Sequence, residues 1–225
     1  MQIQVLSPCR QGQDVALSYD TVDLRRVLPT GGAGVYTLDL FAGDRKSVDI
    51  TFADGTRRVL PVVANDLGRV SKIAVRWRAP VNLDLHVFEN GAMAGQPGHV
   101  WTQAPASAAA AVEVVKATGR GHGFLNAFDD GPGDKIEVYT YVHGSQDQGT
   151  NVAMALDHET RGSLPAAATC GQGALAKIEF GVIMLARSGE VSSAGGIFKP
   201  ARCDEPLAAA ARFDYGLMPV IATRN

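Results

Sequence analysis

The stretch that most limits the fold of this chain is RVSKIAVRWRAPVNLDLHVFE, residues 69–89. In each half of it, apolar side chains recur at every second position and therefore share one face. These are Ile73, Val75 and Trp77 in the first half and Leu83, Leu85 and Val87 in the second. Such alternation is typical of half-buried antiparallel strands. We therefore predict a hairpin of two strands with a tight corner at Pro80, and we expect Trp77 to be buried against Leu85 and Val138 or their neighbours.

Further short strands separated by turn residues are predicted along the rest of the chain. They cover residues 15–19, 35–41, 47–52, 56–63, 111–116, 134–143, 151–157 and 176–187. The strand at 111–116 is chosen for its valines, although the alanines at 108–111 favour a helix. We expect the strand at 151–157 to pair with the strand at 134–143. Because no long helices alternate with the strands, the pattern favours an all-β fold, an antiparallel β-sandwich of the immunoglobulin-like or jelly-roll type.

Turn residues mark one boundary within the chain. The run Asn65-Asp66-Leu67-Gly68 has the composition of a connecting turn. We expect residues 1–66 to form a small β-hairpin unit, either separate or a lobe of the sandwich, and residues 67–188 to form the β-sandwich. The C-terminal segment, residues 189–225, is expected to be irregular, with one short helix capped by Asp204.

Charge and hydropathy argue against several kinds of partner. The formal net charge is −2, with 21 Lys and Arg against 23 Asp and Glu, and the basic residues form no stripe. Nucleic acids and anionic membranes require a concentrated basic surface, so neither is expected as the main partner. No apolar run is long enough for a membrane-spanning helix, so no membrane span is expected.

The N-terminal sequence, the composition and the cysteines bear on the cellular compartment of the protein. The chain begins without the basic segment and apolar core of a signal peptide. It therefore either stays in the cytoplasm or has lost such a signal, and its β-rich, glycine-rich, lysine-poor character favours an exported bacterial protein, periplasmic or extracellular. The three cysteines, Cys9, Cys170 and Cys203, show no zinc-binding pattern. Either all three are free thiols, or Cys170 and Cys203 form a disulfide in an oxidising compartment.

The middle of the opening stretch resembles a known sequence signature. Trp77, Pro80 and the run Asn82-Leu83-Asp84-Leu85-His86-Val87 are similar to the W…(D/N)LDLHV signature of an uncharacterised family of bacterial envelope β-sandwich domains. The run also resembles, more loosely, the DLDLY strand of the pre-peptidase C-terminal domains of secreted proteases. The resemblance implies an exported immunoglobulin-like or jelly-roll sandwich that acts as an accessory module and not as a catalyst. Asn82 stands where these families usually carry Asp.

Acidic residues at two places are candidates for a calcium site. The candidate ligands are Asp84 in the opening stretch and Asp129, Asp130 and Asp134 in the acidic turn, DDGPGD. Calcium requires several oxygen ligands, which the carboxylates and free carbonyls of such a turn supply. The same composition is also typical of a turn that holds no metal, and Asp84 can instead bond to a neighbouring loop. Calcium is therefore the one cofactor that the sequence leaves open.

No pattern of catalytic residues is evident in the sequence. The histidines fall in different segments and form neither HxH nor HExxH; they are His86, His99, His122, His143 and His158. The nucleophile patterns GxSxG and SxxK are also missing. His143, Ser145 and Asp147 lie close together in one turn, but this spacing is not the geometry of a triad. We therefore predict no catalytic residues and a protein that is not an enzyme.

Aromatic residues are the best candidates for a binding surface. His99 and Trp101 lie in a long irregular stretch, residues 90–105, and Tyr139 and Tyr141 are expected on the outer face of their strand. Such rings stack on sugars or on proteins while their polar tips stay wet. Alternatively, Trp101 folds back over the end of the sandwich. We expect the irregular stretch and the acidic turn to lie at the same end of the sandwich and to form one binding surface.

These observations lead to an ordered set of functions. The favoured one is a non-enzymatic β-sandwich protein of the bacterial cell envelope that acts through protein–protein contacts in a larger assembly. The alternative is a carbohydrate-binding or calcium-dependent adhesion module, whose partner is a polysaccharide. A hydrolase comes third.

Overall fold

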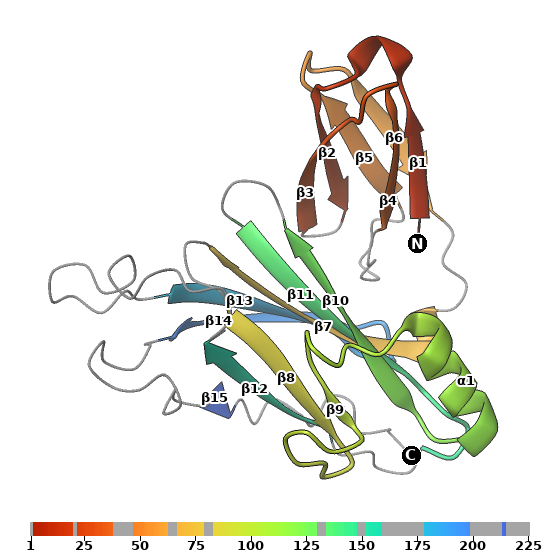
Figure 1. Ribbon diagram of the computed structural model, residues 1–225, viewed down its shortest axis with the longest axis vertical. Coiled ribbons are helices and arrows are strands. Elements are labelled where there is room, and N and C mark those ends of the chain that lie inside the picture. Colours follow the sequence, from red (N-terminus) through yellow and green to blue (C-terminus); the bar gives the residue numbers. More distant parts are fainter. Residues whose placement is uncertain are drawn as a thin grey trace, which may run out of the picture.

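The computed structural model describes residues 2–19, 22–37, 47–62, 67–78, 83–129, 134–147, 152–158, 178–198 and 213–214. Over these ranges the protein is mostly β, with several antiparallel sheets and one short α-helix (Figure 1). No helix in the described ranges is long and apolar enough to cross a membrane. The prediction of an all-β, sandwich-like fold is therefore confirmed.

The N-terminal unit consists of two small sheets. Its strands are β1 (Gln2–Leu6) and β4 (Ala33–Thr37) in one sheet, and β3 (Val22–Val27), β2 (Asp14–Tyr19), β5 (Ser47–Phe52) and β6 (Arg57–Pro61), in that spatial order, in the other. Two 3-10 turns, Pro8–Arg10 and Leu67–Arg69, precede β2 and β7. An Asp-Gly turn joins β5 to β6. The turn is stabilised by a hydrogen bond from the Thr56 amide to the Asp54 carboxylate, 2.9 Å long, and Gly55 adopts the φ of 80° that the turn requires.

The second unit is a sandwich of two antiparallel sheets. The larger sheet has the order β10 (His122–Asp129), β11 (Asp134–Val142), β7 (Val70–Arg78), β13 (Ile178–Leu185), β14 (Val191–Phe198), and the smaller has the order β15 (Phe213–Asp214), β12 (Val152–His158), β8 (Leu83–Glu89), β9 (His99–Val100). β14 extends the larger sheet beyond the predicted boundary at residue 188. Cys170, Cys203 and the expected C-terminal helix lie outside the described residues, whereas Cys9 is an exposed free thiol.

The hairpin predicted for residues 69–89 is wrong, because β7 and β8 belong to different sheets. Both strands form where the alternation predicts them, but the chain crosses from one sheet to the other between them. Their apolar faces therefore meet in one cluster of buried residues, which contains both Trp77 and Leu85. We call this cluster the first core. β12 likewise pairs with β8, with Leu156 opposite Leu85, and not with β11 as predicted. Alternation shows that a strand has two unlike faces, but it does not specify the neighbouring strand.

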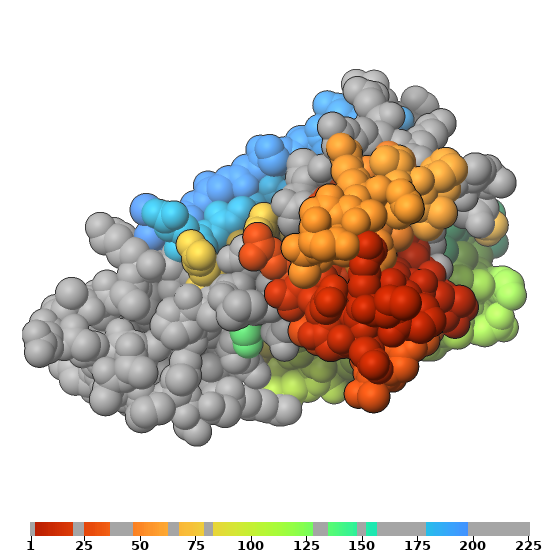
Figure 2. Space-filling view, turned by 90° about the horizontal axis from the view of Figure 1, so that it is seen from above, coloured from red at the N-terminus to blue at the C-terminus, as the bar shows by residue number. Residues whose placement is uncertain are grey.

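The outer face of the larger sheet is covered as well. Several apolar residues on this face join residues of the N-terminal unit in a second core: Ala74, Ile136, Val138 and Leu185. Figure 2, which looks down the long axis of the molecule, shows the N-terminal unit, in red to orange, in front of the sandwich. β7 and β11 are consequently buried on both faces. Val138, one of the two neighbours predicted for Trp77, belongs to this second core and not to the first.

The segment predicted as a strand at 111–116 is part of a helix, α1 (Ala108–Thr118). The Ser107 hydroxyl caps the first turn by accepting a backbone N–H at 3.1 Å. Gly119 ends the helix in the left-handed conformation, with a φ of 67°. Ala111 packs against β10 and β11 on the outer face of the larger sheet. A helix is favoured because both of its ends are capped, which the valines of the segment do not indicate.

Candidate functional site

Tyr139 and Tyr141 lie inside the sandwich, and their predicted place on its outer face is wrong. Both are 0% exposed and belong to the first core. β11 presents its aliphatic residues outward instead, because Ile136 and Val138 pack in the second core with the N-terminal unit. The two tyrosine rings therefore do not reach the protein surface.

Two glycines preceding and opening β10 make room for these tyrosines. The Tyr141 side chain occupies the place where a Cβ atom of Gly121 would lie, and the Tyr139 ring occupies the corresponding place at Gly123. Glycine is the residue that allows such a close approach within a strand. The Gly-His-Gly sequence at 121–123 therefore serves packing, and a phosphate-binding role has no support.

A buried carboxylate connects the two sheets beside Tyr139. Glu89, at the end of β8, accepts the Tyr139 hydroxyl at 2.7 Å and the Gly123 amide at 2.8 Å. Its other carboxylate oxygen lies 2.6 Å from His122 Nδ1. This hydrogen bond raises the pKa of His122, because the carboxylate stabilises the imidazolium form. Burial, and then the nearby Glu89 charge, raise the pKa of Tyr139 well above its ordinary value.

A serine, a histidine and an aspartate that are distant in sequence meet at one end of the larger sheet. Ser71 Oγ lies 2.8 Å from His143 Nε2, and His143 Nδ1 lies 3.5 Å from Asp147 Oδ2. The same oxygen of Asp147 accepts the Gly144 amide at 2.8 Å. Burial lowers the pKa of His143, and the positive charge of Arg187 acts in the same direction. The sequence did not indicate this cluster, since Ser71 is far from the turn that holds the other two residues.

The three residues are arranged in the sequence serine, histidine, aspartate, as in a hydrolase triad, but the serine is not accessible to a substrate. Ser71 is only 1% exposed and lies on the inner face of β7, the central strand of the larger sheet. A nucleophilic serine has to reach the carbonyl carbon of a substrate. The distance from His143 to Asp147 is also too long for a hydrogen bond. The cluster therefore stabilises the end of the sheet and gives no support to a hydrolase function.

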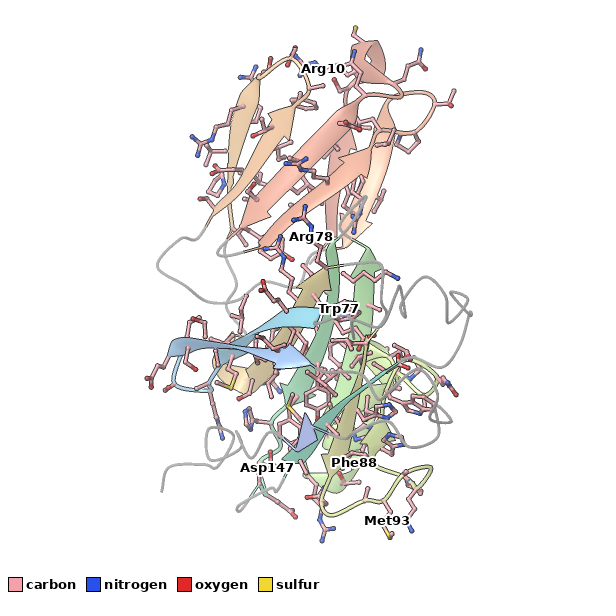
Figure 3. The ribbon with its side chains drawn as sticks, turned by 90° about the vertical axis from the view of Figure 1, so that its left-hand side faces the viewer. Arg10, Trp77, Arg78, Phe88, Met93 and Asp147 are labelled. Carbon is pink, nitrogen blue, oxygen red and sulfur yellow. The ribbon has the colours of Figure 1, made fainter. Side chains whose placement is uncertain are left out.

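The two loops predicted to form one surface lie at opposite ends of the sandwich. Asp134, the last residue of the acidic turn, is opposite Arg78 at the end of β7. The stretch of residues 90–105 leaves the sandwich at Glu89, the last residue of β8. The chain enters β8 at Leu83, after β7 ends at Arg78, so Glu89 is at the end of β8 away from Arg78. Figure 3 shows Arg78 next to the N-terminal unit and Met93, which belongs to the stretch, at the far end of the sandwich. The prediction of a shared binding surface is therefore wrong.

The candidate calcium ligands are not gathered at one place in the described residues. Asp84 lies on the smaller sheet, whereas Asp129 ends β10 and Asp134 begins β11 on the larger sheet. Asp130 lies outside the described residues. Within those that are described, no three His, Cys, Asp or Glu side chains form a group that could hold a metal ion. Calcium binding by the acidic turn itself stays a prediction.

The stretch of residues 90–105 folds back along β8. Asn90 and three glycines take positive φ values and turn the chain; the glycines are Gly91, Gly95 and Gly98. β9 then pairs with β8, which places His99 opposite Phe88. Backbone hydrogen bonds between Trp101 and Ala104 close a tight turn directly after β9. The stretch thus lays its aromatic side chains on the outer face of the smaller sheet.

Four aromatic rings meet on this face, and we call them the ring array: His86, Phe88, His99 and Trp101. His86 and Phe88 come from β8, whereas His99 and Trp101 come from β9 and the residue that follows it. The ring centroids of His99 and Phe88 are 4.7 Å apart, as are those of Trp101 and His86. The contacting rings are nearly parallel, with interplanar angles from 6° to 25°.

The two histidines of the array are hydrogen-bonded in a common plane. His86 Nδ1 lies 2.9 Å from His99 Nε2, the ring centroids are 5.1 Å apart and the planes differ by 12°. Coplanar imidazoles joined nitrogen to nitrogen at hydrogen-bonding distance have centroids roughly 5 Å apart. The two rings therefore lie side by side and not face to face. Because the pair occupies one diagonal of the array, it lies between the rings of Trp101 and Phe88.

Polar groups border the array at the Trp101 end. Thr102 Oγ1 donates a hydrogen bond to Asp84 Oδ1 at 2.8 Å. Of the predicted site residues, the structure therefore brings Asp84, His99 and Trp101 to one face of the smaller sheet. Trp101 is partly exposed, whereas His99 is largely buried beneath its neighbours.

Sequence reasoning missed that His86 and Phe88 belong to the same site as Trp101. A signal for them was present, because they alternate with the apolar residues of β8 and share the face of Asp84. What the sequence did not show is the pairing of β9 with β8, which brings the two pairs of rings together.

Comparison of the chain with known protein families, with curated proteins and with solved structures finds no match. The resemblance of residues 77–87 to bacterial envelope sandwich domains therefore stays a prediction.

Proposed function

We propose that this protein is a non-catalytic β-sandwich module of the bacterial cell envelope that binds a saccharide through the ring array. The position of the array is the observation that carries the proposal. The N-terminal unit and α1 both pack on the larger sheet. The array lies on the outer face of the smaller sheet, with His86, Phe88 and Trp101 partly exposed. Grouped aromatic rings that remain in contact with solvent are typical of binding sites.

The size of the array favours a saccharide over a protein partner. The array spans two neighbouring strands, β8 and β9, and strand spacing gives it a width of roughly 10 Å. A specific protein–protein interface buries about 800 Å² on each partner, which is far more than four such rings present. One or two sugar rings match this surface. The carbohydrate-binding alternative from the sequence therefore ranks above the protein–protein contacts that the sequence favoured.

The chemistry of the array fits the two kinds of surface on a sugar ring. The indole of Trp101 is a flat apolar surface on which the C–H face of a pyranose can stack. Next to it, the partly exposed Thr102 hydroxyl, which bonds to the largely buried Asp84 carboxylate, is a hydrogen-bonding group for sugar hydroxyls. Thr102 can accept a hydrogen bond from a sugar while keeping its bond to Asp84, because a hydroxyl oxygen has two lone pairs.

The proposal is tested with a glycan array and by calorimetric titration with chitotetraose, a soluble analogue of cell-wall glycan. We expect Trp101→Ala to weaken binding at least tenfold, or about 1.4 kcal/mol, and Trp101→Phe to retain part of the affinity. Ile197→Ala is the matched control, because Ile197 is an exposed apolar residue on the larger sheet. Urea unfolding of each variant shows whether a loss of affinity reflects binding or folding.

Two outcomes contradict the proposal. The first is a parent protein that binds neither chitotetraose nor any saccharide of the glycan array. The second is a Trp101→Ala variant that binds as tightly as the parent, which would place the saccharide site elsewhere on the molecule. A protein partner that requires Trp101, found together with no glycan binding, would return the protein–protein reading to first place.

A further inference from the structure

We propose that His86 and His99 form a latch that one proton opens, so that saccharide binding to the ring array weakens in mildly acidic solution. The statement about saccharide rests on the proposed function. The latch itself rests on the hydrogen bonds of the two rings and can be tested without a ligand.

A backbone amide sets the direction of the hydrogen bonds in the latch. The Gly95 N–H donates to His99 Nδ1 at 3.0 Å, so this nitrogen carries no proton. The proton of the neutral His99 ring is therefore on Nε2, which donates to His86 Nδ1 at 2.9 Å. His86 then carries its own proton on Nε2. Both histidines are neutral in this arrangement, and it cannot reverse because a backbone N–H only donates.

An additional proton breaks one of these two hydrogen bonds. A proton on His86 Nδ1 would face the Nε2–H of His99. If the proton of His99 moved to Nδ1 to preserve the bond between the rings, it would face the Gly95 N–H. In either case one bond is lost and a positive charge appears between Trp101 and Phe88. Stacking of the cation on these rings offsets part of the cost, but the lost bond is not replaced.

The latch matters because it joins the turn at residues 93–98 to β8, beside the pairing of β9, the core residue Val100 and the bond from Thr102 to Asp84. β9 consists of only two residues, His99–Val100. The turn before it is tied by the Gln96 side chain, which accepts the Met93 amide at 2.9 Å, and by the bond from Gly95 to His99. Loss of a latch bond therefore loosens the chain between Met93 and Trp101. The flat arrangement of the array, and with it the surface for the sugar, depends on that segment.

Acidic residues occur at neighbouring register positions on the smaller sheet. Asp84 on β8 accepts the bond from Thr102, Asp157 on β12 pairs with Asp84, and Asp214 on β15 pairs with Ala155, the partner of His86. The Asp84 carboxylate favours the uptake of a proton by a nearby histidine. We therefore expect the latch to open on acidification.

Nuclear magnetic resonance of the histidine ring nitrogens tests the latch directly in the full chain. At about pH 8, both His86 and His99 should be in the Nε2–H form. The Gly95 amide resonance should shift together with the His99 ring as the solution is acidified through the imidazole range. A His99 ring in the Nδ1–H form at high pH, or a Gly95 amide that does not respond to acid, would overturn the latch.

Trp101 provides a second readout. The chain has two tryptophans, so only Trp101 emits in a Trp77→Phe variant, and a protonated imidazole stacked on an indole quenches its emission. We expect the emission to fall on acidification. The double variant H86N/H99Q keeps an acceptor and a donor without a titrating ring and should lose the response, whereas His122→Gln, the matched control, should keep it. If Trp77→Phe does not fold, the resonance titration of the parent decides the question.

Chitotetraose binding separates the latch from the proposed function. The affinity of the parent should fall by up to about tenfold per pH unit below the midpoint, as linkage to one proton requires. The affinity of the H86N/H99Q variant should change much less. If chitotetraose binds at no pH while the ring titrations occur as expected, the proposed function fails and the latch stands. If it binds equally well at high and low pH, the regulatory inference fails.

Discussion

Strands β8 and β11 have similar sequence patterns, but opposite kinds of side chain face the first core. Each alternates aliphatic residues with polar and aromatic ones: Leu83, Leu85 and Val87 with Asp84, His86 and Phe88 in β8, and Ile136 and Val138 with Glu137, Tyr139 and Tyr141 in β11. In β8 the aliphatic residues face the first core. In β11 the tyrosines face the first core and the aliphatic residues face the N-terminal unit. Alternation therefore does not reveal which face points inward when both faces of a sheet are covered.

The inward orientation of β11 requires partners that β8 does not need. The Glu137 carboxylate accepts the Leu85 amide of the opposite sheet at 2.6 Å. The Tyr139 hydroxyl donates to Glu89, and Gly123 leaves room for the Tyr139 ring. Buried polar groups are costly unless they are hydrogen-bonded. On β8, by contrast, His86 and Phe88 of the corresponding face are partly exposed and can contact a ligand.

Replacing one aromatic residue on each strand should give the largest difference between them. Tyr139→Ala removes a fully buried ring and the donor to Glu89, so we expect a loss of about 3–5 kcal/mol in the free energy of unfolding. Phe88→Ala removes a partly exposed ring and should cost about 1 kcal/mol. Urea unfolding of both variants measures the difference. Equal losses would show that the two strands do not differ in orientation as described.

The strands of the sandwich were predictable because alternation is a local property of the sequence. Their pairing was not. The pattern of residues 69–89 suits a hairpin as well as a crossing between sheets, and the choice depends on the meeting of Trp77 and Leu85 in the core. Helix α1 was missed for a related reason, since its two caps and the packing of Ala111 outweigh the β preference of its valines.

The candidate site was predictable only in part. Trp101 and His99 stand out because aromatic residues are unexpected in an irregular stretch. Their partner His86 is contributed by another strand, and the contact depends on a register that the turns of the stretch determine. The tyrosines of β11 were misplaced because nothing in their own strand reveals that the N-terminal unit covers its other face.

A glycine substitution sharpens the comparison at a smaller scale. Gly123→Ala places a methyl group against the buried Tyr139 ring, and overpacking of this kind should cost about 1–3 kcal/mol. Gly181→Ala on β13 is the matched control, because nothing lies within 4 Å of the added atom. There we expect no loss, or a gain of about 0.5 kcal/mol, since alanine in a strand is less flexible than glycine. Urea unfolding decides the prediction, and a destabilised Gly181→Ala would contradict it.

The smallest expected effect is a pH dependence with opposite signs at two histidines, the partly buried His122 and the buried His143. The bond to Glu89 raises the pKa of His122 in the folded protein, so the folded state holds this proton more tightly than the unfolded state. Its contribution to stability is therefore complete below the ordinary imidazole range and is lost as the pH rises through the raised pKa. Burial lowers the pKa of His143, so its contribution is present above the ordinary range and is lost on acidification.

Unfolding free energies measured across the imidazole range of pH should separate the two contributions. His122→Gln should remove the decline on the alkaline side and leave the acidic decline in place, with an effect below about 1 kcal/mol, the usual size of a hydrogen-bond contribution. His143→Gln should do the reverse. An alkaline decline that persists in His122→Gln would show that the link between Glu89 of β8 and the buried face of β11 does not depend on a charged His122. The orientation of β11 would then rest on the hydrogen bond from Tyr139 and on the space left by Gly123.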